Sequence, residues 1–163
     1  TQAQLYGLVN AIRLKETTYK SAGSVHGCAL FRGEDMLVFV EDVGRHNAID
    51  TIAGWMWMNP EATSAAPSTQ AGQADTAPFQ PMGGADKVFY TTGRLTSEMV
   101  IKSAQMGVPI VVSRSGITQM GWQVARRLGL CAIGRAMNKR FLCYSAPERL
   151  QWQPELAGGS ILN

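Results

Sequence analysis

The chain has 163 residues, of which 45% are hydrophobic and 17% charged, a composition that favours one globular domain with a real core. Its 15 Lys and Arg residues give a formal net charge of only +3 and are dispersed, which excludes a nucleic-acid-coating protein but leaves an anionic small molecule as a ligand. Charged residues interrupt every apolar run outside one linker, so we expect no membrane insertion. The three cysteines, Cys28, Cys131 and Cys143, are far apart and predict buried free thiols in a reducing compartment.

The first third of the chain predicts a helix, a hairpin and a second helix. Apolar residues recur at helical spacing from Leu5 to Ile12 and again from Ala48 to Met58. Between these segments, two apolar runs flank a polar turn that contains Gly33, which is typical of two antiparallel strands. The expected elements are a helix over about 4–15, strands over 25–31 and 36–40, and a helix from 48 to 58.

The composition changes abruptly at residues 59–85. Ala, Ser, Thr, Gln, Pro and Gly dominate this segment, and its only charged residues are Glu61 and Asp75. Such a segment has too few apolar residues to form a core of its own. We therefore expect a flexible surface insertion within a single domain that extends over residues 1–163.

The remainder of the chain alternates between strands and helices. Alternation with short connections predicts parallel strands joined by right-handed crossovers, with helices on both faces of the sheet. With the hairpin at one side, the predicted fold is a three-layer α/β/α fold with a mixed sheet. The expected elements are strand 87–92, helix 96–105, strand 109–113, helix 118–128, strand 130–134 and a final strand 140–144.

Three strand-to-helix loops share a polar design and should lie at the carboxyl edge of the sheet, where open α/β sheets bind ligands. They are residues 41–47, 91–98 and 113–118. Arginines and hydroxyls beside helix N-termini are suited to an anion such as phosphate. Alternatively, Arg94 and Arg114 pair on the surface with Glu98, Asp42 or Asp86, and the hydroxyls only cap helices. The candidate contacts from the second and third loops are Arg94, Ser97, Ser113, Arg114 and Ser115.

The histidines and one cationic segment complete the candidate site. His26 and His46 are the only histidines, and His46 follows Arg45 within a dense polar run. Each histidine could contact a ligand or brace a loop. Residues 134–140 are the most cationic part of the chain and could form either a solvated turn or a clamp for a pyrophosphate. The histidines and cysteines lack metal-ligand spacing and no Gly-x-Ser-x-Gly elbow occurs, so we predict no catalytic metal, no zinc and no Ser-His-Asp triad.

Taken together, these motifs resemble the formate dehydrogenase accessory sulfurtransferase family (FdhD type). The run Glu-Asp-Val-Gly-Arg-His-Asn is the most specific of them, and the matches follow the family's order from the first helix to Leu150. They leave out little besides the predicted insertion. The matching segments are 23–26, 41–50, 92–100, 112–115 and 144–150.

The resemblance implies a fold, a reaction and partners. It implies a cytidine-deaminase-like fold without the zinc site, in a cytoplasmic protein that is usually a homodimer. Members of the family take sulfur as a persulfide from a cysteine desulfurase. They pass it to the molybdenum or tungsten bis(molybdopterin guanine dinucleotide) cofactor that the catalytic subunit of formate dehydrogenase requires. The family's cofactor-binding stretch aligns with Arg135, Ala136, Met137, Asn138, Lys139 and Arg140.

One feature of the family does not match this chain. Its persulfide-carrying cysteine belongs to a Cys-x-x-Cys loop upstream of the first helix, and neither that loop nor the domain before it occurs here. A persulfide relay requires an accessible thiolate, which cysteines in apolar strands do not supply. We therefore assign no catalytic residue, and the absence of an initiator Met leads us to expect a piece of a longer protein. The alternatives are a binding-only cofactor chaperone and, with less support, a hydrolase or deaminase of free nucleotides.

Overall fold

A computed structural model of the protein describes residues 1–63, 82–156 and 159–161. Its described strands form one seven-stranded sheet in the order β2-β1-β3-β4-β5-β6-β7. The strands β3, β4 and β5 are mutually parallel, whereas β1 is antiparallel to both β2 and β3. The strands are β1 (His26–Arg32), β2 (Asp35–Asp42), β3 (Lys87–Thr91), β4 (Ile110–Ser113), β5 (Cys131–Met137), β6 (Arg140–Ser145) and β7 (Gly159–Ile161).

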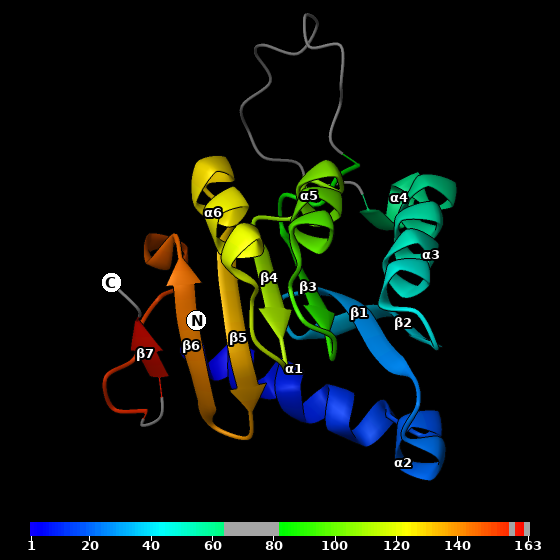
Figure 1. Cartoon of the computed structure of the whole chain (residues 1–163), viewed down its shortest axis with the longest axis horizontal. Coiled ribbons are helices and arrows are strands. Elements are labelled where there is room, and N and C mark those ends of the chain that lie inside the picture. The colour runs from blue at the N-terminus through cyan, green and yellow to red at the C-terminus, as the bar shows by residue number, and fades with distance from the viewer. Residues whose placement is uncertain (64–81, 157–158, 162–163) are drawn as a thin grey trace, which may run out of the picture.

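Helices cover both faces of this sheet, so the predicted three-layer α/β/α architecture is confirmed (Figure 1). The helices α3, α5 and α6 pack on one face, and α1 crosses the other. The helices are α1 (Gln2–Lys15), α2 (Thr18–Ala22), α3 (Arg45–Met58), α4 (Pro60–Thr63), α5 (Ser97–Gln105) and α6 (Gln119–Leu128), with a 3-10 turn η1 (Pro147–Arg149) after β6.

The central strands are apolar at successive positions because both of their faces are buried. In β1, Cys28 and Leu30 belong to the core beneath α3 and α5, while Ala29 and Phe31 belong to the core above α1. Successive side chains of a strand point to opposite faces, so a strand covered on both sides carries an unbroken apolar run. The two cores therefore fix the sheet from both sides and leave its loops at the edge.

The structure differs from the expected elements at four places. A short helix, α2, stands where a loop was expected, and α4 occupies the start of the predicted insertion. The strand β5 continues to Met137 and pairs with β6, so the cationic segment is a β-hairpin rather than a loop beyond the sheet. The strand β7 was not expected at all. The part of the predicted insertion at residues 64–81 lies outside the described residues.

No described helix combines the length and the apolar character that a crossing of the bilayer would require. This finding agrees with the interrupted apolar runs of the sequence.

Candidate functional site

The loops that follow β3 and β4 are joined to each other by backbone hydrogen bonds. The Leu95 amide donates to the Gly116 carbonyl at 3.0 Å, and the Thr118 amide donates to the Leu95 carbonyl at the same distance. On the other side, the Arg135 amide donates to the Ser115 carbonyl at 2.7 Å, which connects β5 to the same assembly. These bonds hold three chain segments in fixed positions beside the carboxyl ends of the parallel strands.

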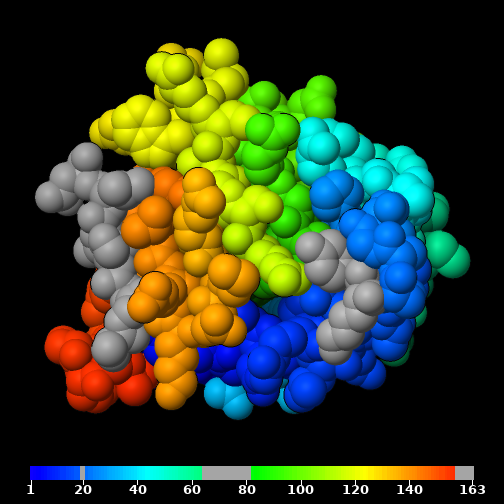
Figure 2. All heavy atoms as spheres, turned by 60° about the horizontal axis from the view of Figure 1, so that its bottom comes forward, coloured from blue at the N-terminus to red at the C-terminus, as the bar shows by residue number. Residues whose placement is uncertain are grey.

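A cavity of about 720 Å³ lies where these segments meet the start of β1. Arg94 and Arg114 line it from the loops after β3 and β4, and Arg135 lines it from β5, together with His26 and Ser115. None of the described residues that line it is acidic. Figure 2 looks onto this face, where the β5–β6 hairpin, the loop after β4 and the blue segments around α1 and α2 meet. We call this the anion cavity.

A bulge in β5 aims Arg135 at this cavity. The pairing of β5 with β6 shifts between Gly134 and Met137, and Arg135 has a φ of 54° in the left-handed region. A non-glycine residue adopts that conformation at a cost of about 1–2 kcal/mol. The preceding residue must be glycine because an added Cβ would lie 2.5 Å from Tyr144 Cε2 and 2.9 Å from the Ser115 carbonyl oxygen. The aromatic ring and the loop thus approach the backbone of β5 directly.

A second cavity of about 540 Å³ lies between α1 and the β5–β6 hairpin. Tyr6 and Arg13 line it from the helix, and Lys139 lines it from the hairpin. Arg114 and Met137 line both cavities, so the two adjoin. We call this the helix cavity.

An ion pair holds Arg114 at the junction of the two cavities. Its Nη1 donates to both carboxylate oxygens of Glu16, at 3.1 and 3.3 Å. The Glu16 side chain is only 3% exposed, whereas that of Arg114 is 33% exposed. The alternative in which Arg114 pairs with a carboxylate thus named the wrong residues, since the carboxylate is that of Glu16 and not that of Glu98, Asp42 or Asp86. Glu16 follows α1 and was not among the residues singled out in the sequence.

The serine hydroxyls mostly brace the loops. Ser113 is fully buried, and its Oγ donates to the Gly93 carbonyl at 2.6 Å and accepts from the Ser115 amide at 3.0 Å. The Ser115 hydroxyl donates to the Thr92 carbonyl at 2.9 Å, although this residue also lines the anion cavity. Ser97 is the first residue of α5, next to its N-cap Thr96, and it lines neither cavity. Of the three predicted serines, Ser115 alone lines the anion cavity, and its contact with a ligand stays a prediction.

The two histidines lie in different environments. His26 lines the anion cavity, where burial and then the charge of Arg45 lower its pKa below the usual 6.5. His46 instead pairs with Glu98, with 3.3 Å between Nε2 and Oε2, in a shallow depression between α3 and α5. The structure thus brings His26 to the predicted site and places His46 elsewhere.

Arg45 lies next to His26 but does not line either cavity. An added Cβ on Gly93 would be 3.0 Å from Arg45 Cδ and 3.4 Å from His26 Nδ1, so both side chains pass close to this glycine. The Arg45 Nε is buried and has no hydrogen-bond partner among the described residues. Its guanidinium acts on the site through its charge.

The stretch from Arg135 to Arg140 divides between the two cavities. Arg135 faces the anion cavity, while Ala136, Asn138 and Lys139 line the helix cavity. Ala136 is 1% exposed and packs in the core above α1. Arg140 lines neither cavity and pairs with Met137 at the start of β6. The segment therefore separates the two cavities, with side chains that line one or the other.

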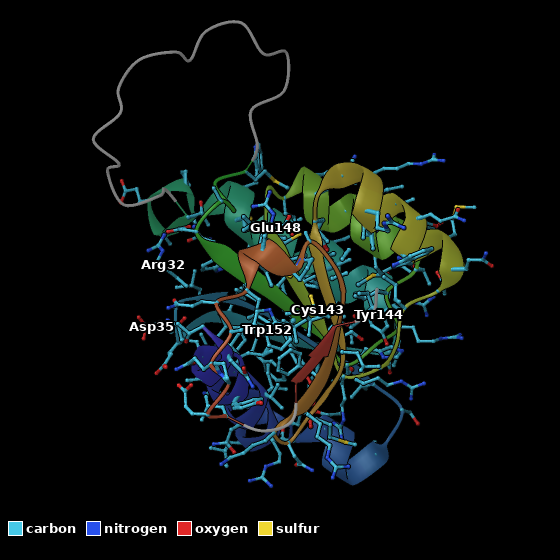
Figure 3. The ribbon with its side chains drawn as sticks, turned by 90° about the vertical axis from the view of Figure 1, so that its left-hand side faces the viewer. Arg32, Asp35, Cys143, Tyr144, Glu148 and Trp152 are labelled. Atoms are coloured by element: carbon cyan, nitrogen blue, oxygen red, sulfur yellow. The ribbon has the colours of Figure 1, made fainter. Side chains whose placement is uncertain are left out.

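All three cysteines are free and completely buried, as the sequence predicts. Burial raises the pKa of the Cys28 thiol to about 12, against the usual 9.0. The sulfurs of Cys131 and Cys143 lie 4.0 Å apart in the core, where their hydrogen bond and burial raise the pKa of Cys131. Figure 3 shows Cys143 and Tyr144 as neighbours on β6. Cys143 lies in the core on the α1 side of the sheet, whereas Tyr144 packs against the core on the other side. A nucleophilic sulfur requires an accessible thiolate, which none of these residues provides.

The arrangement is suited to binding a ligand with concentrated negative charge. Guanidinium groups bind phosphate through two parallel hydrogen bonds, and several of them around one cavity are suited to a phosphate or pyrophosphate group. Among the described residues, no group of three or more His, Cys, Asp or Glu side chains has the arrangement of a metal site. The geometry provides a cavity suited to an anion, and the three cysteines offer it no accessible thiol.

Comparisons with known proteins identify relatives of this chain. The FdhD/NarQ family matches residues 1–151. The chain is 34% identical over 134 residues to the sulfur carrier protein FdhD of Bacillus subtilis (strain 168), covering 82% of this chain and 43% of that protein. It is 31% identical over 150 residues to the protein of the same name from Halalkalibacterium halodurans, covering 92% of this chain and 48% of that protein. The chain therefore spans less than half the length of these two relatives.

A solved structure has the same fold. The crystal structure of a putative formate dehydrogenase accessory protein from Desulfotalea psychrophila superposes with a TM-score of 0.74 at 29% identity. The match covers 92% of this chain and 56% of that one. The chain belongs to the FdhD/NarQ family.

Proposed function

We propose that this chain is the cofactor-binding part of a sulfur carrier that serves formate dehydrogenase. Its substrate is the molybdenum bis(molybdopterin guanine dinucleotide) cofactor, whose pyrophosphate groups enter the anion cavity. The observation that carries the proposal is the convergence of Arg94 and Arg114 from two loops and of Arg135 from β5 on one cavity, whose described lining residues include no acid. Phosphate oxygens are the complementary ligand for such a cluster.

The proposed roles of the site residues follow from their positions. Arg94 and Arg135 bind phosphate oxygens directly, because neither forms an ion pair with a carboxylate among the described residues and both are exposed. Arg114 is oriented by Glu16 and adds charge where the two cavities meet. The helix cavity, with Tyr6 and Lys139 in its walls, provides the adjoining space for the rest of a large ligand.

The sulfur atom itself must be brought by a thiol other than those of this chain. Cys28, Cys131 and Cys143 are buried in strands and cannot accept a persulfide without local unfolding. We propose that the relay cysteine belongs to the part of the relatives that this chain does not cover. The expected partners are a cysteine desulfurase as sulfur donor and the catalytic subunit of formate dehydrogenase as recipient. The expected assembly is a homodimer, and three free thiols suit the expected cytoplasmic location.

Titration calorimetry with GDP as the probe tests the binding step. We expect Arg94→Gln and Arg135→Gln each to weaken GDP binding about tenfold or more, because charged hydrogen bonds contribute about 1.5–3 kcal/mol. Arg114 is a poorer test, since its removal leaves the buried Glu16 without its partner. The matched control is Arg127→Gln, an exposed arginine in the last turn of α6 that lines neither cavity. Equal affinity in all four proteins would overturn the assignment of the anion cavity.

A second function is favoured by the lack of an accessible thiol. A cofactor chaperone would bind and escort the finished cofactor without transferring sulfur. Both functions predict GDP binding, so GDP binding does not distinguish them. The distinguishing measurement is persulfide transfer to the cofactor by a fusion protein in which the upstream half of a relative is joined to this chain. Binding without sulfuration of the cofactor would favour the chaperone.

A further inference from the structure

We propose that His26 is a proton-dependent contact of the anion cavity: a phosphoryl group held between the arginines draws a proton onto this imidazole, which adds a positive charge to the bound state. The inference rests on the proposed function, since it concerns the same cavity. It assigns His26 a role in binding that His46 does not share.

The geometry places His26 among the groups that would hold the anion. It begins β1 and lines the cavity together with Arg94, Arg114 and Arg135. The backbone at Gly93 passes close to its ring, because an added Cβ there would be 3.4 Å from His26 Nδ1. A ligand bound between the three arginines would share the cavity with this imidazole.

The charges around His26 in the free protein oppose its protonation. Arg45 approaches from α3, and the three cavity arginines face it from the loops after β3 and β4 and from β5. The opposing position on β2 is Asp42, whose carboxylate accepts hydrogen bonds from the Gly44 amide at 2.7 Å and the Asn47 side chain at 3.1 Å. Glu16 is already paired with Arg114. Burial, followed by the charge of Arg45, keeps the pKa of His26 below its usual value.

A bound phosphoryl dianion reverses this balance. Opposite charge within about 4–6 Å favours the protonated imidazole, as does a hydrogen bond from its ring nitrogen to a phosphate oxygen. The proton comes from solvent, and no covalent bond to the ligand forms or breaks. Linkage requires that the ligand raise the proton-binding constant of His26 by the same factor by which protonation of His26 tightens ligand binding. A rise of about one pH unit corresponds to a tenfold difference in affinity.

The measurement is an NMR pH titration of the two histidine side chains of the 163-residue chain. Affinity against pH alone is ambiguous, because a phosphate monoester loses its own second proton near pH 6. The ring resonances report each imidazole directly, and His46 is an internal control because it pairs with Glu98 away from the cavity. His26→Gln and His46→Gln assign the two signals. The probes are inorganic pyrophosphate and GDP at saturating concentrations, with binding confirmed by calorimetry.

We expect pyrophosphate to raise the titration midpoint of His26 by about one unit and to leave that of His46 in place. Binding without movement of the His26 midpoint, equal movement of both midpoints, or no binding of pyrophosphate would each overturn the inference. The GDP arm tests the proposed function separately. If pyrophosphate moves His26 but GDP does not bind, the nucleotide assignment fails and the anion contact stands. If GDP binds and neither probe moves His26, the proposed function stands and the inference fails.

Discussion

At the scale of single residues, Gly134 decides whether the anion cavity can form. A methyl group there would meet the Tyr144 ring and the Ser115 carbonyl, both of which are held by the loops and β6. We expect Gly134→Ala to lower the free energy of unfolding by about 1–3 kcal/mol, because overpacked sites shift their backbone. The shift should also move Arg135 and weaken GDP binding. Chemical denaturation and calorimetry measure the two effects.

The control for this substitution is Gly54, which lies within α3. An added Cβ at Gly54 has no neighbour within 4 Å. Alanine at an open helical position stabilises by roughly 0.5–1 kcal/mol relative to glycine. If Gly134→Ala proved as harmless as Gly54→Ala, the close approach of Tyr144 to β5 would not be what fixes the bulge.

The sequence predicted correctly which arginines lie at the same edge of the sheet. It did not predict side-chain contacts between residues that are far apart in the chain. Arg94, Arg114 and Arg135 could be predicted to share one edge because strand ends of a parallel sheet meet there. The Glu16–Arg114 pair joins residues 98 positions apart, and no local pattern marks it. His46 belongs to a dense polar motif, yet its place on the first turn of α3 turns it toward Glu98.

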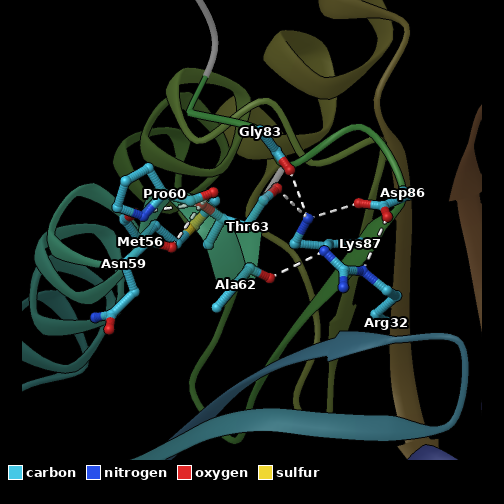
Figure 4. A network of polar contacts seen from close by, with 9 residues as sticks. All are labelled: Arg32, Met56, Asn59, Pro60, Ala62, Thr63, Gly83, Asp86 and Lys87. Carbon is cyan, nitrogen blue, oxygen red and sulfur yellow. Dashed lines mark hydrogen bonds and ion pairs between the residues drawn. The ribbon is translucent and has the colours of Figure 1, made fainter. Parts of the chain in front are cut away.

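At the scale of elements, a buried lysine stabilises the junction between α4, β3 and the segment before it. Lys87 is 1% exposed, and its ammonium donates to the carbonyls of Thr63 and Gly83 and to the Asp86 carboxylate at 2.6–2.7 Å. Arg32 joins the other Asp86 oxygen to the Ala62 carbonyl, both at 2.9 Å (Figure 4). Thr63 and Gly83 stand on opposite sides of residues 64–81 in the sequence, and Lys87 holds these two described residues together.

We expect Lys87→Met to lower the free energy of unfolding by about 2–3 kcal/mol, because two carbonyls and a carboxylate lose their donor. Lys102→Met is the matched control, since Lys102 makes an exposed ion pair with Asp50 that should contribute less than about 1 kcal/mol. Urea denaturation of the three proteins measures the difference. Equal stability of the two variants would show that the network contributes no more than a surface pair.

The pH dependence of this difference follows from Asp86. Burial alone would raise its pKa, but the hydrogen bond from Lys87 and the charges of Lys87 and Arg32 outweigh burial and lower the pKa. A carboxyl with a lowered pKa stabilises the fold above its ordinary value of 3.8 and loses that contribution as the pH falls below it. The gap between the wild-type chain and Lys87→Met should therefore narrow in acid.

The elements that sequence reasoning found are those with strong periodicity. The strands β3 and β4 and the helices α5 and α6 stand within a residue or two of their expected bounds. The helix α2 was missed because five residues are too short for a periodic pattern. The end of β5 was missed because a positive φ at Arg135 interrupts the alternation on which strand recognition depends.

At the scale of the whole molecule, the architecture separates the arginines of the anion cavity from the cysteines. Three arginines gather around one cavity at an edge of the sheet, whereas the cysteine sulfurs lie inside the two cores. Composition and β-α alternation were enough to predict the layers. The narrower likeness to cytidine deaminases remains an expectation, because the solved structure that superposes on this chain is that of a formate dehydrogenase accessory protein.

This separation predicts that the isolated chain accepts no sulfur. After incubation with a cysteine desulfurase and cysteine, we expect the intact mass of the chain to show no added sulfur atom. A thiol reagent at pH 7–8 should leave the native chain unlabelled, because all three cysteine sulfurs are buried. The Cys28 thiol, whose pKa is raised to about 12, also stays protonated at that pH. The denatured chain, with three accessible cysteines, is the positive control for the reagent. A persulfide on any cysteine of the native chain would contradict the division of labour, and mapping it would identify which strand opens to admit the donor.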